Sequence, residues 1–498
     1  MSPRFDLDAP VPPAEELGAV HFVGVGGVGM SGVARVMLAR GLRVSGSDAK
    51  DVPVLAALRA LGGRVAVGFD PARLDGVSTV VAGSAIRESN PELAAARERG
   101  LRVLHRSQAL QAVMHGRRVV AVAGTNGKTT TTSMLTVVLQ HAGADPSFAV
   151  GGELVGAGTN AHEGTGDVFV AEADESDSSF LVYSPHVAVV TNVQPDHLDH
   201  YGTVDALEAA FAAFVDRVVP GGVLVACADD RGSAALAARA RARGARAVTV
   251  GSSLDADVRL GGVRSEGART SFDLTDLTDR TDPTDRAGGT GASGAAPVRV
   301  RLRVPGWHNV LDAAAAYAAA TTLGVAPALA VEGLEAFTGT RRRFEARGEA
   351  GGVRVYDDYA HNPAKVAAAV GTAREVAGAG RLLVVFQPHL YSRTLDFAED
   401  FARALSVADE VFVMDVYAAR EDPVPGVTGA LVADRVDLPP ERVRYVESWS
   451  AVAPAVAAAA RPGDLVLTVG AGDVTMVAGE VLSLLAEQHP VAGSGVPR

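Results

Sequence analysis

Short apolar runs alternate with longer, alanine-rich segments along most of this 498-residue chain. The runs are bounded by glycine and polar residues, which is typical of buried strands, while the longer segments carry apolar residues at helical spacing. In the first part of the chain, this pattern predicts strands at 20–23, 42–45 and 78–82 and a helix at 31–40. Alternating strands and helices favour parallel, doubly wound sheets, which bind ligands at the carboxyl ends of their strands.

The same alternation recurs twice, so the pattern predicts an α/β protein with three domains, at residues 1–116, 117–339 and 340–498. In the second domain it predicts helices at 130–141 and 310–323 and strands at 118–123, 168–172, 186–191 and 222–227. In the third it predicts strands at 353–356, 382–386, 410–414 and 465–469. A Thr/Asp repeat at about 274–297 has few apolar residues and is predicted to be a mobile surface insertion.

Composition and charge narrow the class of protein. The net charge of −12 argues against nucleic acid or an anionic membrane surface as the main partner. Cys227 is the only cysteine, so an intramolecular disulfide is impossible. The first 16 residues are acidic and rich in proline, unlike a secretion signal, and no apolar run is long enough to span a bilayer. We therefore expect a cytoplasmic protein without membrane insertion, of unknown oligomeric state.

The segment Gly124-Thr125-Asn126-Gly127-Lys128-Thr129 joins a predicted strand to a predicted helix. Only three of the 46 Lys and Arg residues are lysine, so a lysine here is atypical of ordinary surface charge. The backbone N–H groups of such a turn bind phosphate oxygens, the lysine neutralises the β- and γ-phosphates, and the threonine hydroxyl takes Mg²⁺. Val122 replaces the earlier glycine of the usual pattern. The alternative is a strand–helix turn that needs its glycines for structure alone.

Two further polar segments follow predicted strands. The first, Glu172 to Asp177, holds four carboxylates within six residues. Magnesium prefers oxygen ligands, so Glu172, at the strand end, is a candidate ligand; the alternative is a solvated acidic loop. The second segment, 191–200, contains His197, which could be a metal ligand, a base or a satisfied loop residue. Because no cysteine lies close by, zinc is not favoured.

Three other segments are candidate ligand sites. Glycines at 24, 26, 27 and 29 follow a predicted strand, and Asp48 ends the next one, which favours a diphosphate site without choosing between NAD and a nucleotide sugar. Polar residues at 357–363 and 387–393 follow strands of the third domain. These two are either ordinary loops or one binding edge.

Together these segments resemble the Mur ligase family, the ATP-dependent amide-forming enzymes of peptidoglycan precursor synthesis. The resemblance runs from about residue 21 to 481 and rests on the segments HFVGVGGVGMSGVA, AGTNGKTTT, AEADESD, TNVQPDHLDHY, PGWHN, RRF, DDYAHNP and FQPH. It implies an N-terminal Rossmann-like domain for a UDP-sugar, a central P-loop ATPase with a mostly parallel sheet, and a C-terminal Rossmann-like domain for the amino acid. It also implies ATP and Mg²⁺ as cofactors and an acyl-phosphate route of carboxylate activation.

The resemblance also implies roles for individual residues. It implies ATP binding by Gly124, Thr125, Asn126, Gly127, Lys128, Thr129, Thr130, Asn309, Arg343 and Asp358. It implies metal binding by Thr129, Glu172 and His197, and catalysis by Lys128, Glu172, His197 and Arg343. It implies UDP-sugar binding by Gly26, Gly27, Gly29, Asp48 and Ser84. It implies amino-acid binding by Tyr359, His361, His389 and Arg393.

Within the family, the resemblance favours the branch that joins L-alanine to UDP-N-acetylmuramate. Ligases for later residues typically use a carbamylated lysine as an extra metal ligand, and here no lysine lies between Lys128 and Lys365. Asn126, Asp312 and Leu390 depart from the usual residues of the alanine branch. A ligase that joins a murein tripeptide to the same sugar is the nearest alternative. The other alternative functions are a nicotinamide oxidoreductase and a non-catalytic nucleotide-binding module.

Overall fold

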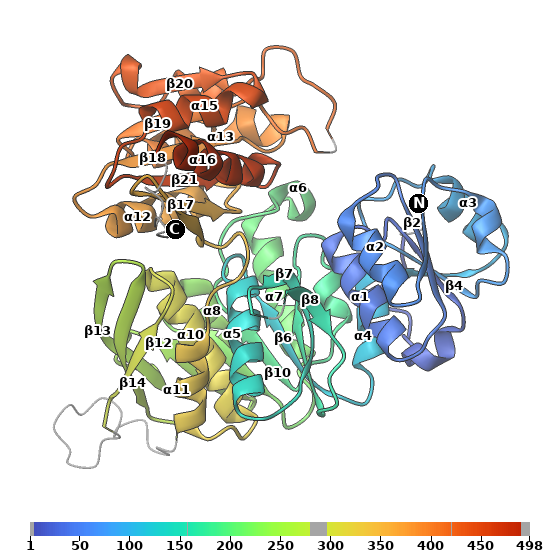
Figure 1. Ribbon diagram of the computed structural model, residues 1–498. Helices are drawn as coiled ribbons and strands as arrows, with labels where there is room; N and C mark the ends of the chain where they lie inside the picture. Colours follow the sequence, from blue (N-terminus) through green and yellow to red (C-terminus); the bar gives the residue numbers. More distant parts are fainter. Residues whose placement is uncertain (1–3, 157, 279–295, 420, 490–498) are drawn as a thin grey trace, which may run out of the picture. The chain divides into compact units, whose positions relative to one another are not determined.

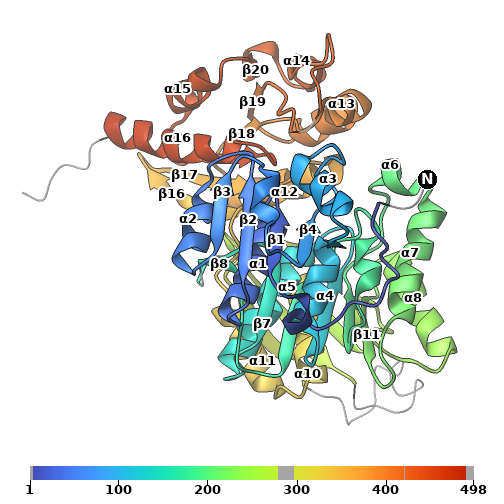
Figure 2. The same ribbon diagram turned by 90° about the vertical axis from the view of Figure 1, so that its right-hand side faces the viewer.

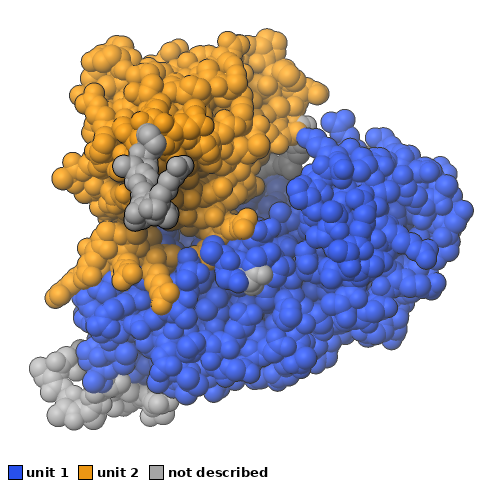
Figure 3. All heavy atoms as spheres, viewed as in Figure 1, with its two compact units in different colours: residues 1–263, 271–302, 307–338 blue, residues 264–270, 303–306, 339–498 orange. Residues whose placement is uncertain are grey.

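The computed structural model describes residues 4–156, 158–278, 296–419 and 421–489. The chain forms two compact units (Figure 3). The first comprises residues 1–263, 271–302 and 307–338, and the second comprises 264–270, 303–306 and 339–498. Within the described residues, the first unit contains a five-stranded and a ten-stranded sheet, and the second contains a six-stranded sheet (Figure 1).

The N-terminal sheet of the first unit has strand order β3-β2-β1-β4-β5, and every neighbouring pair is parallel. Its strands are β1 Val20–Val23, β2 Val44–Asp48, β3 Arg64–Val67, β4 Thr79–Ala82 and β5 Arg102–His105. Its helices are α1 Val28–Ala39, α2 Pro53–Ala60, α3 Pro91–Glu98 and α4 Arg106–Met114, with 3₁₀ turns η1 Ala14–Leu17 and η2 Pro71–Leu74. Because all five strands are parallel, the loops after them open on one edge.

The central sheet has the order β15-β14-β13-β12-β11-β10-β6-β9-β7-β8. Its strands are β6 Arg118–Ala123, β7 Ser147–Leu154, β8 Thr159–His162, β9 Val168–Glu172, β10 Val187–Val190, β11 Val223–Cys227, β12 Arg246–Gly251, β13 Val258–Glu266, β14 Arg269–Asp276 and β15 Val298–Leu302. The helices are α5 Lys128–His141, α6 Leu198–Tyr201, α7 Val204–Asp216, α8 Arg231–Ala242, α10 Trp307–Thr322 and α11 Pro327–Ala336, with the turn η3 Ser179–Val182. In sheet order from β12 through β11, β10, β6 and β9 to β7, every neighbouring pair is parallel, whereas β8 pairs antiparallel to β7.

The sheet of the second unit has the order β16-β17-β21-β18-β19-β20. Its strands are β16 Glu345–Ala350, β17 Val353–Asp358, β18 Leu382–Phe386, β19 Glu410–Met414, β20 Val443–Val446 and β21 Leu465–Val469. Its helices are α12 Pro363–Ala377, α13 Tyr391–Leu405, α14 Ala430–Ala433, α15 Trp449–Ala459 and α16 Val474–Gln488, with the turn η4 Pro440–Arg442. Only the edge strand β16 is antiparallel to its neighbour, so the carboxyl ends of the other five strands lie at one edge of the sheet.

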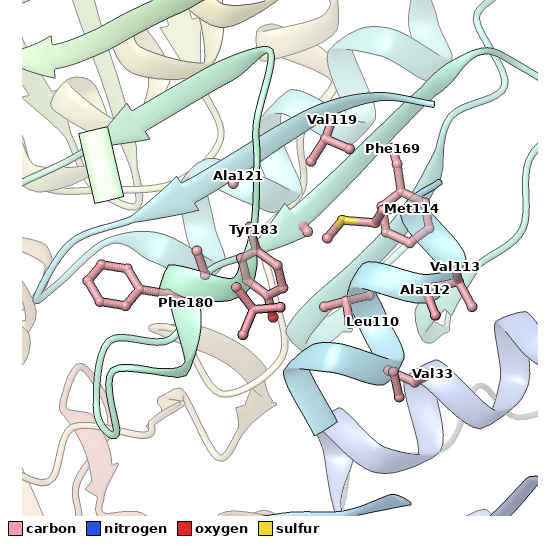
Figure 4. Close-up of a cluster of buried hydrophobic side chains, with 14 of the residues drawn as sticks. Val33, Leu110, Ala112, Val113, Met114, Val119, Ala121, Phe169, Phe180 and Tyr183 are labelled. Atoms are coloured by element: carbon pink, nitrogen blue, oxygen red, sulfur yellow. The ribbon is translucent and has the colours of Figure 1, made fainter. Parts of the chain in front are cut away.

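One hydrophobic core joins the two sheets of the first unit. Val33 of α1 and Leu110 of α4 are buried in the same cluster as Val119 of β6, Phe169 of β9 and Phe180 of η3 (Figure 4). Figure 1 and Figure 2 show α1 beside β7 and β8 of the central sheet, and α1 contacts both strands. Contacts between the loops of the two sheets are therefore contacts within one packed body.

Every strand and helix for which the sequence pattern predicted a range is present, but several ends differ, and other strands, among them β3, β5, β7 and β8, were not predicted. Helix α1 begins at Val28 rather than 31, and strand β2 begins at Val44 rather than 42. The predicted insertion at about 274–297 is wrong at its start. Strand β14 continues to Asp276, and the buried Leu277 donates its backbone N–H to the Asp257 carbonyl at 2.7 Å. Residues 279–295 lie outside the described part of the chain. In that described part, no helix combines the length and apolar character needed to cross a membrane.

Candidate active site

The predicted phosphate loop lies at the carboxyl end of β6, where it leads directly into α5. Gly124 and Gly127 have φ values of 137° and 82°, which strongly favour glycine. A side chain at Gly127 would also collide with the carboxylate of Asp312, and one at Gly124 with the hydroxyl of Thr191. The glycines are therefore required by the backbone, and they leave the N-terminal turn of α5 open to a ligand.

The segment after β10 fixes the shape of this loop. The backbone N–H of Asn126 donates to Asn192 Oδ1 at 2.9 Å, and the hydroxyl of Thr191 donates to the Asn126 carbonyl at 2.6 Å. The Thr125 hydroxyl donates to the Gln194 carbonyl at 3.0 Å. Segment 191–194 therefore supports the loop, which the sequence could not show.

Lys128 lies in the first turn of α5 with its ammonium group inside the loop. Its Nζ donates to the Gly124 carbonyl at 2.6 Å and lies 2.7 Å and 2.9 Å from the two carboxylate oxygens of Glu175. Burial opposes the charge, but the carboxylates of Glu175, Asp174 and Glu172 raise the pKa of Lys128 above its usual value. The lysine is therefore a fixed positive charge at the helix N-terminus.

The predicted magnesium ligands can be tested against these neighbours. Thr129 Oγ1 donates to Glu172 Oε1 at 3.0 Å, and Gly151 N–H donates to Glu172 Oε2 at 2.6 Å. His197 Nε2 lies 3.8 Å from Glu175 Oε1. The described residues contain no group of three or more His, Cys, Asp or Glu side chains able to enclose a metal alone. A hydroxyl beside one carboxylate is a set of hard oxygen donors that fits Mg²⁺, which usually takes one or two carboxylates and completes its shell with phosphate and water.

The glycine segment of the N-terminal sheet forms the turn between β1 and α1. Gly26 N–H donates to Asp48 Oδ2 at 2.8 Å, so Asp48, at the end of β2, anchors the turn. A side chain at Gly26 would collide with that carboxylate. The hydroxyl of Ser84, after β4, donates to Asp177 Oδ2 and lies 3.1 Å from Nε2 of His105. The predicted UDP-sugar residues therefore share one edge of this sheet.

Asp174, Glu175 and Asp177 form a loop that contacts residues at the carboxyl edges of both sheets of the first unit. Asp174 Oδ2 accepts a hydrogen bond from Arg106 Nη2 at 3.3 Å, whereas Glu175 pairs with Lys128 and Asp177 with Ser84. Burial opposes the charge of Asp174, but Lys128 and Arg106 lower its pKa to about 2. We name residues 174–177 the acidic loop. Its three carboxylates face positive or polar groups rather than solvent alone.

Residues predicted at the amino-acid end gather at the carboxyl edge of the second unit's sheet. The carboxylate of Asp358, at the end of β17, accepts the backbone N–H groups of Phe344 at 2.8 Å and Ala360 at 2.7 Å. Burial raises the pKa of Asp358 although Arg343 opposes the shift.

Aromatic and cationic groups surround this carboxylate. The Arg343 guanidinium lies 5.2 Å from the centroid of the Tyr359 ring. The rings of His361 and His389 are 5.9 Å apart, and Arg393 Nη1 donates to the His361 carbonyl at 3.3 Å. Burial lowers the pKa of His361 well below its usual value, so its imidazole is neutral at pH 7. The predicted residues thus lie together, while their ligand stays a prediction.

Comparison with family models decides the family. The model of the Mur ligase family catalytic domain matches residues 19–118, that of the Mur ligase middle domain matches 122–320, and that of the Mur ligase glutamate ligase domain matches 342–472. The chain belongs to the Mur ligase family. Members of this family are ATP-dependent ligases that form amide bonds, and the sequence-based prediction of the family is confirmed.

Individual Mur ligases resemble the chain over nearly its whole length. UDP-N-acetylmuramate–L-alanine ligase of Kineococcus radiotolerans is 59% identical over 95% of this chain and 97% of its own. The crystal structure of UDP-N-acetylmuramate–alanine ligase of Thermotoga maritima has a TM-score of 0.78 and 28% identity, covering 94% of this chain and 99% of that one. A murein peptide ligase of Psychrobacter arcticus has a TM-score of 0.67 and 25% identity, covering 96% and 100%.

Sequence reasoning missed Arg106 and the pairing of Glu175 in this Mur ligase. Arg106 follows β5 directly, at the same sheet edge as the glycine turn. The signal was present as the polar run His105-Arg106-Ser107-Gln108 after an apolar strand. Asn309, predicted to bind ATP, is buried in the first turn of α10, which packs against α5 beside the phosphate loop.

Proposed function

We propose that this Mur ligase joins L-alanine to the carboxylate of UDP-N-acetylmuramate, with conversion of ATP to ADP and phosphate, in the synthesis of peptidoglycan precursors. The observation that supports the reaction type is the grouping of Lys128, Thr129 and Glu172 at adjacent strand ends, beside a glycine loop at a helix N-terminus. The choice of alanine is supported by the curated relative at 59% identity, which carries that activity in its name.

The residues of the first unit have distinct proposed tasks. The N-terminal turn of α5 and Lys128 bind the β- and γ-phosphates, because a helix N-terminus and a fixed ammonium both favour anions. Thr129, Glu172 and His197 hold Mg²⁺, which when bound neutralises phosphate charge and lets an anionic carboxylate approach. The glycine turn with Asp48 and Ser84 binds the UDP-sugar.

The reaction then proceeds in two displacements. The sugar carboxylate attacks the γ-phosphorus, and ADP leaves with the electrons of the broken P–O bond. The alanine amine attacks the resulting acyl phosphate, and phosphate leaves from the tetrahedral intermediate while the amine loses a proton. Both displacements depend on positioning and charge stabilisation, which the fixed ammonium of Lys128 supplies. Arg343, Asp358 and the residues around Tyr359 belong to the second unit, and their contacts with nucleotide and amino acid stay predictions.

Substrate-dependent ADP release tests this proposal. With UDP-N-acetylmuramate and Mg-ATP present, L-alanine is expected to give faster ADP release than L-Ala-γ-D-Glu-diaminopimelate, and mass spectrometry should find UDP-N-acetylmuramoyl-L-alanine. Faster turnover with the tripeptide would instead assign the chain to murein peptide ligation. Nucleotide hydrolysis that ignores the UDP-sugar would contradict both assignments.

A further inference from the structure

Arg106 extends from the last strand of the N-terminal sheet towards the glycine turn of the first. It begins α4 directly after β5, and β4 is the only strand between β5 and β1. Because these strands are parallel, the loops after β1, β4 and β5 lie at one edge. Arg106 is therefore placed at the edge that carries Gly24 to Gly29 and Ser84.

The side chain of Arg106 lies against Gly29, in the first turn of α1. A Cβ atom at Gly29 would be 3.0 Å from Arg106 Cδ and 3.3 Å from Cζ, and would collide with Nη1. Gly29 therefore lets the guanidinium reach the helix N-terminus, where the first backbone N–H groups have no partner within the helix. A positive charge at this end is opposed by the helix dipole, so it needs an anion for compensation.

Arg40 and Glu163 also form an ion pair between these two sheets, and its geometry differs from that of the pair between Arg106 and Asp174. Arg40 donates to both carboxylate oxygens of Glu163, at 2.9 Å and 3.0 Å, and both side chains are 13% exposed. Arg106 makes one contact of 3.3 Å with Asp174, and these side chains are 29% and 39% exposed. The Arg40–Glu163 pair therefore already links the two sheets. The guanidinium of Arg106, by contrast, is partly accessible at the glycine turn.

We infer that Arg106 binds the diphosphate of the sugar nucleotide, with Asp174 orienting the guanidinium from the opposite side. The inference rests on the proposed function, because it takes the glycine turn as the UDP-sugar site. The planar guanidinium can donate two parallel N–H bonds to phosphate oxygens, while the N-terminal turn of α1 donates backbone N–H groups. The collision at Gly29 explains why that position needs glycine although it lies inside a helix.

Calorimetric titration of the full-length protein with UDP, UDP-N-acetylglucosamine and UDP-N-acetylmuramate tests the inference. Arg106→Ala should weaken all three by roughly 10- to 100-fold, because charge-assisted hydrogen bonds to the shared diphosphate are lost. Arg106→Lys should bind with intermediate affinity, since it keeps the charge but loses the fork. Arg118→Ala is the matched control: Arg118 pairs with Asp167 at 2.7 Å, at the opposite, amino-terminal end of β6, and should change none of the three affinities.

Each result separates the inference from the proposed function. If wild type binds all three ligands and Arg106→Ala binds them equally well, the inference is wrong and the function stands. A loss confined to UDP-N-acetylmuramate would place Arg106 at the sugar carboxylate and would also overturn it. If wild type binds no UDP compound, the proposed function itself fails. Binding of Mg-ATP by Arg106→Lys at wild-type affinity shows that the variant is folded, so its UDP affinity remains decisive if the alanine variant is unstable.

Discussion

Two neighbouring carboxylates of the acidic loop hold two cations in different ways. Glu175 and Lys128 are 1% and 13% exposed and approach each other twice, at 2.7 Å and 2.9 Å. Asp174 and Arg106 are 39% and 29% exposed and meet once, at 3.3 Å. The first pair fixes an ammonium inside the phosphate loop. The second holds a guanidinium at the rim of the glycine turn, where it can exchange a carboxylate for another anion at little cost.

In the proposed function, this one loop would lie between two anionic ligands. Asp174 is influenced by both cations, since Lys128 and Arg106 together lower its pKa. A buried pair is strongly coupled and costly to break, whereas a partly exposed one contributes little to stability. We therefore expect changes at Lys128 to affect catalysis most and changes at Asp174 to affect stability least.

The largest effect is expected from Lys128→Ala. Loss of the only ammonium in the loop should lower kcat by about 10²- to 10³-fold, the range seen when one group that stabilises transition-state charge is removed. Affinity for UDP-N-acetylmuramate should stay within about twofold, because Lys128 lies in the phosphate loop and not at the glycine turn. Steady-state kinetics and calorimetry measure the two quantities. Lys128→Arg should remain impaired, since a guanidinium fork does not replace a compact ammonium.

A somewhat smaller effect is expected from Glu172→Gln. The amide keeps the hydrogen bond from Thr129 but loses the charge proposed to bind Mg²⁺. The Mg²⁺ concentration for half-maximal activity should rise by roughly tenfold, consistent with loss of one charged ligand. Activity measured across a magnesium series gives this value. An unchanged magnesium requirement would remove Glu172 from the proposed ligand set.

The two carboxylates should also differ in stability when each is made neutral. Glu175→Gln leaves the largely buried Lys128 without its counter-charge and should lower the free energy of unfolding by about 2–4 kcal/mol. Asp174→Asn should lower it by less than about 1 kcal/mol, since its pair is partly exposed. Urea denaturation of the two variants in parallel makes the comparison. Equal losses of unfolding free energy in the two variants would contradict the proposed difference between the two ion pairs.

A further effect concerns pH at the Arg106 end of the acidic loop. Burial lowers the pKa of His105 to about 4, although the nearby Asp177 opposes the shift. Because the folded state resists protonation, the free energy of unfolding should be highest above pH 6.5 and fall as pH drops from 6.5 to 4. His105→Gln should flatten this slope by about 1–3 kcal/mol across the window. Urea denaturation at several pH values tests it, and a slope shared by both proteins would exclude His105 as its source.

Most strand cores could be predicted because buried parallel strands read as continuous apolar runs. The strands β18, β19 and β21 match the predicted limits to the residue. The edge strand β16, with the sequence EARGEA, carries no such run and is defined by pairing with β17, so the pattern missed it. Strand β13, most of whose residues are exposed, was also missed.

Some residues of the candidate site could be predicted from the sequence and others could not. Lys128 could be predicted because the motif is local and lysine is rare in this chain. The polar run after β5 marks the position of Arg106, but its pairing could not be predicted, because its partner Asp174 is 68 positions away. The same holds for the contacts of segment 191–194 with the phosphate loop, which depend on β10 lying beside β6. A local motif can be recognised in the sequence, whereas an ion pair between distant residues depends on the fold.

The claim that one acidic loop separates two anion sites is tested most directly by a crossed titration. Arg106→Ala and Lys128→Ala are each titrated with UDP-N-acetylmuramate and with a non-hydrolysable ATP analogue in the presence of Mg²⁺. We predict that Arg106→Ala weakens only the sugar nucleotide, by roughly 10- to 100-fold, and that Lys128→Ala weakens only the ATP analogue. Loss of the same ligand in both variants, or no loss in either, would contradict the account.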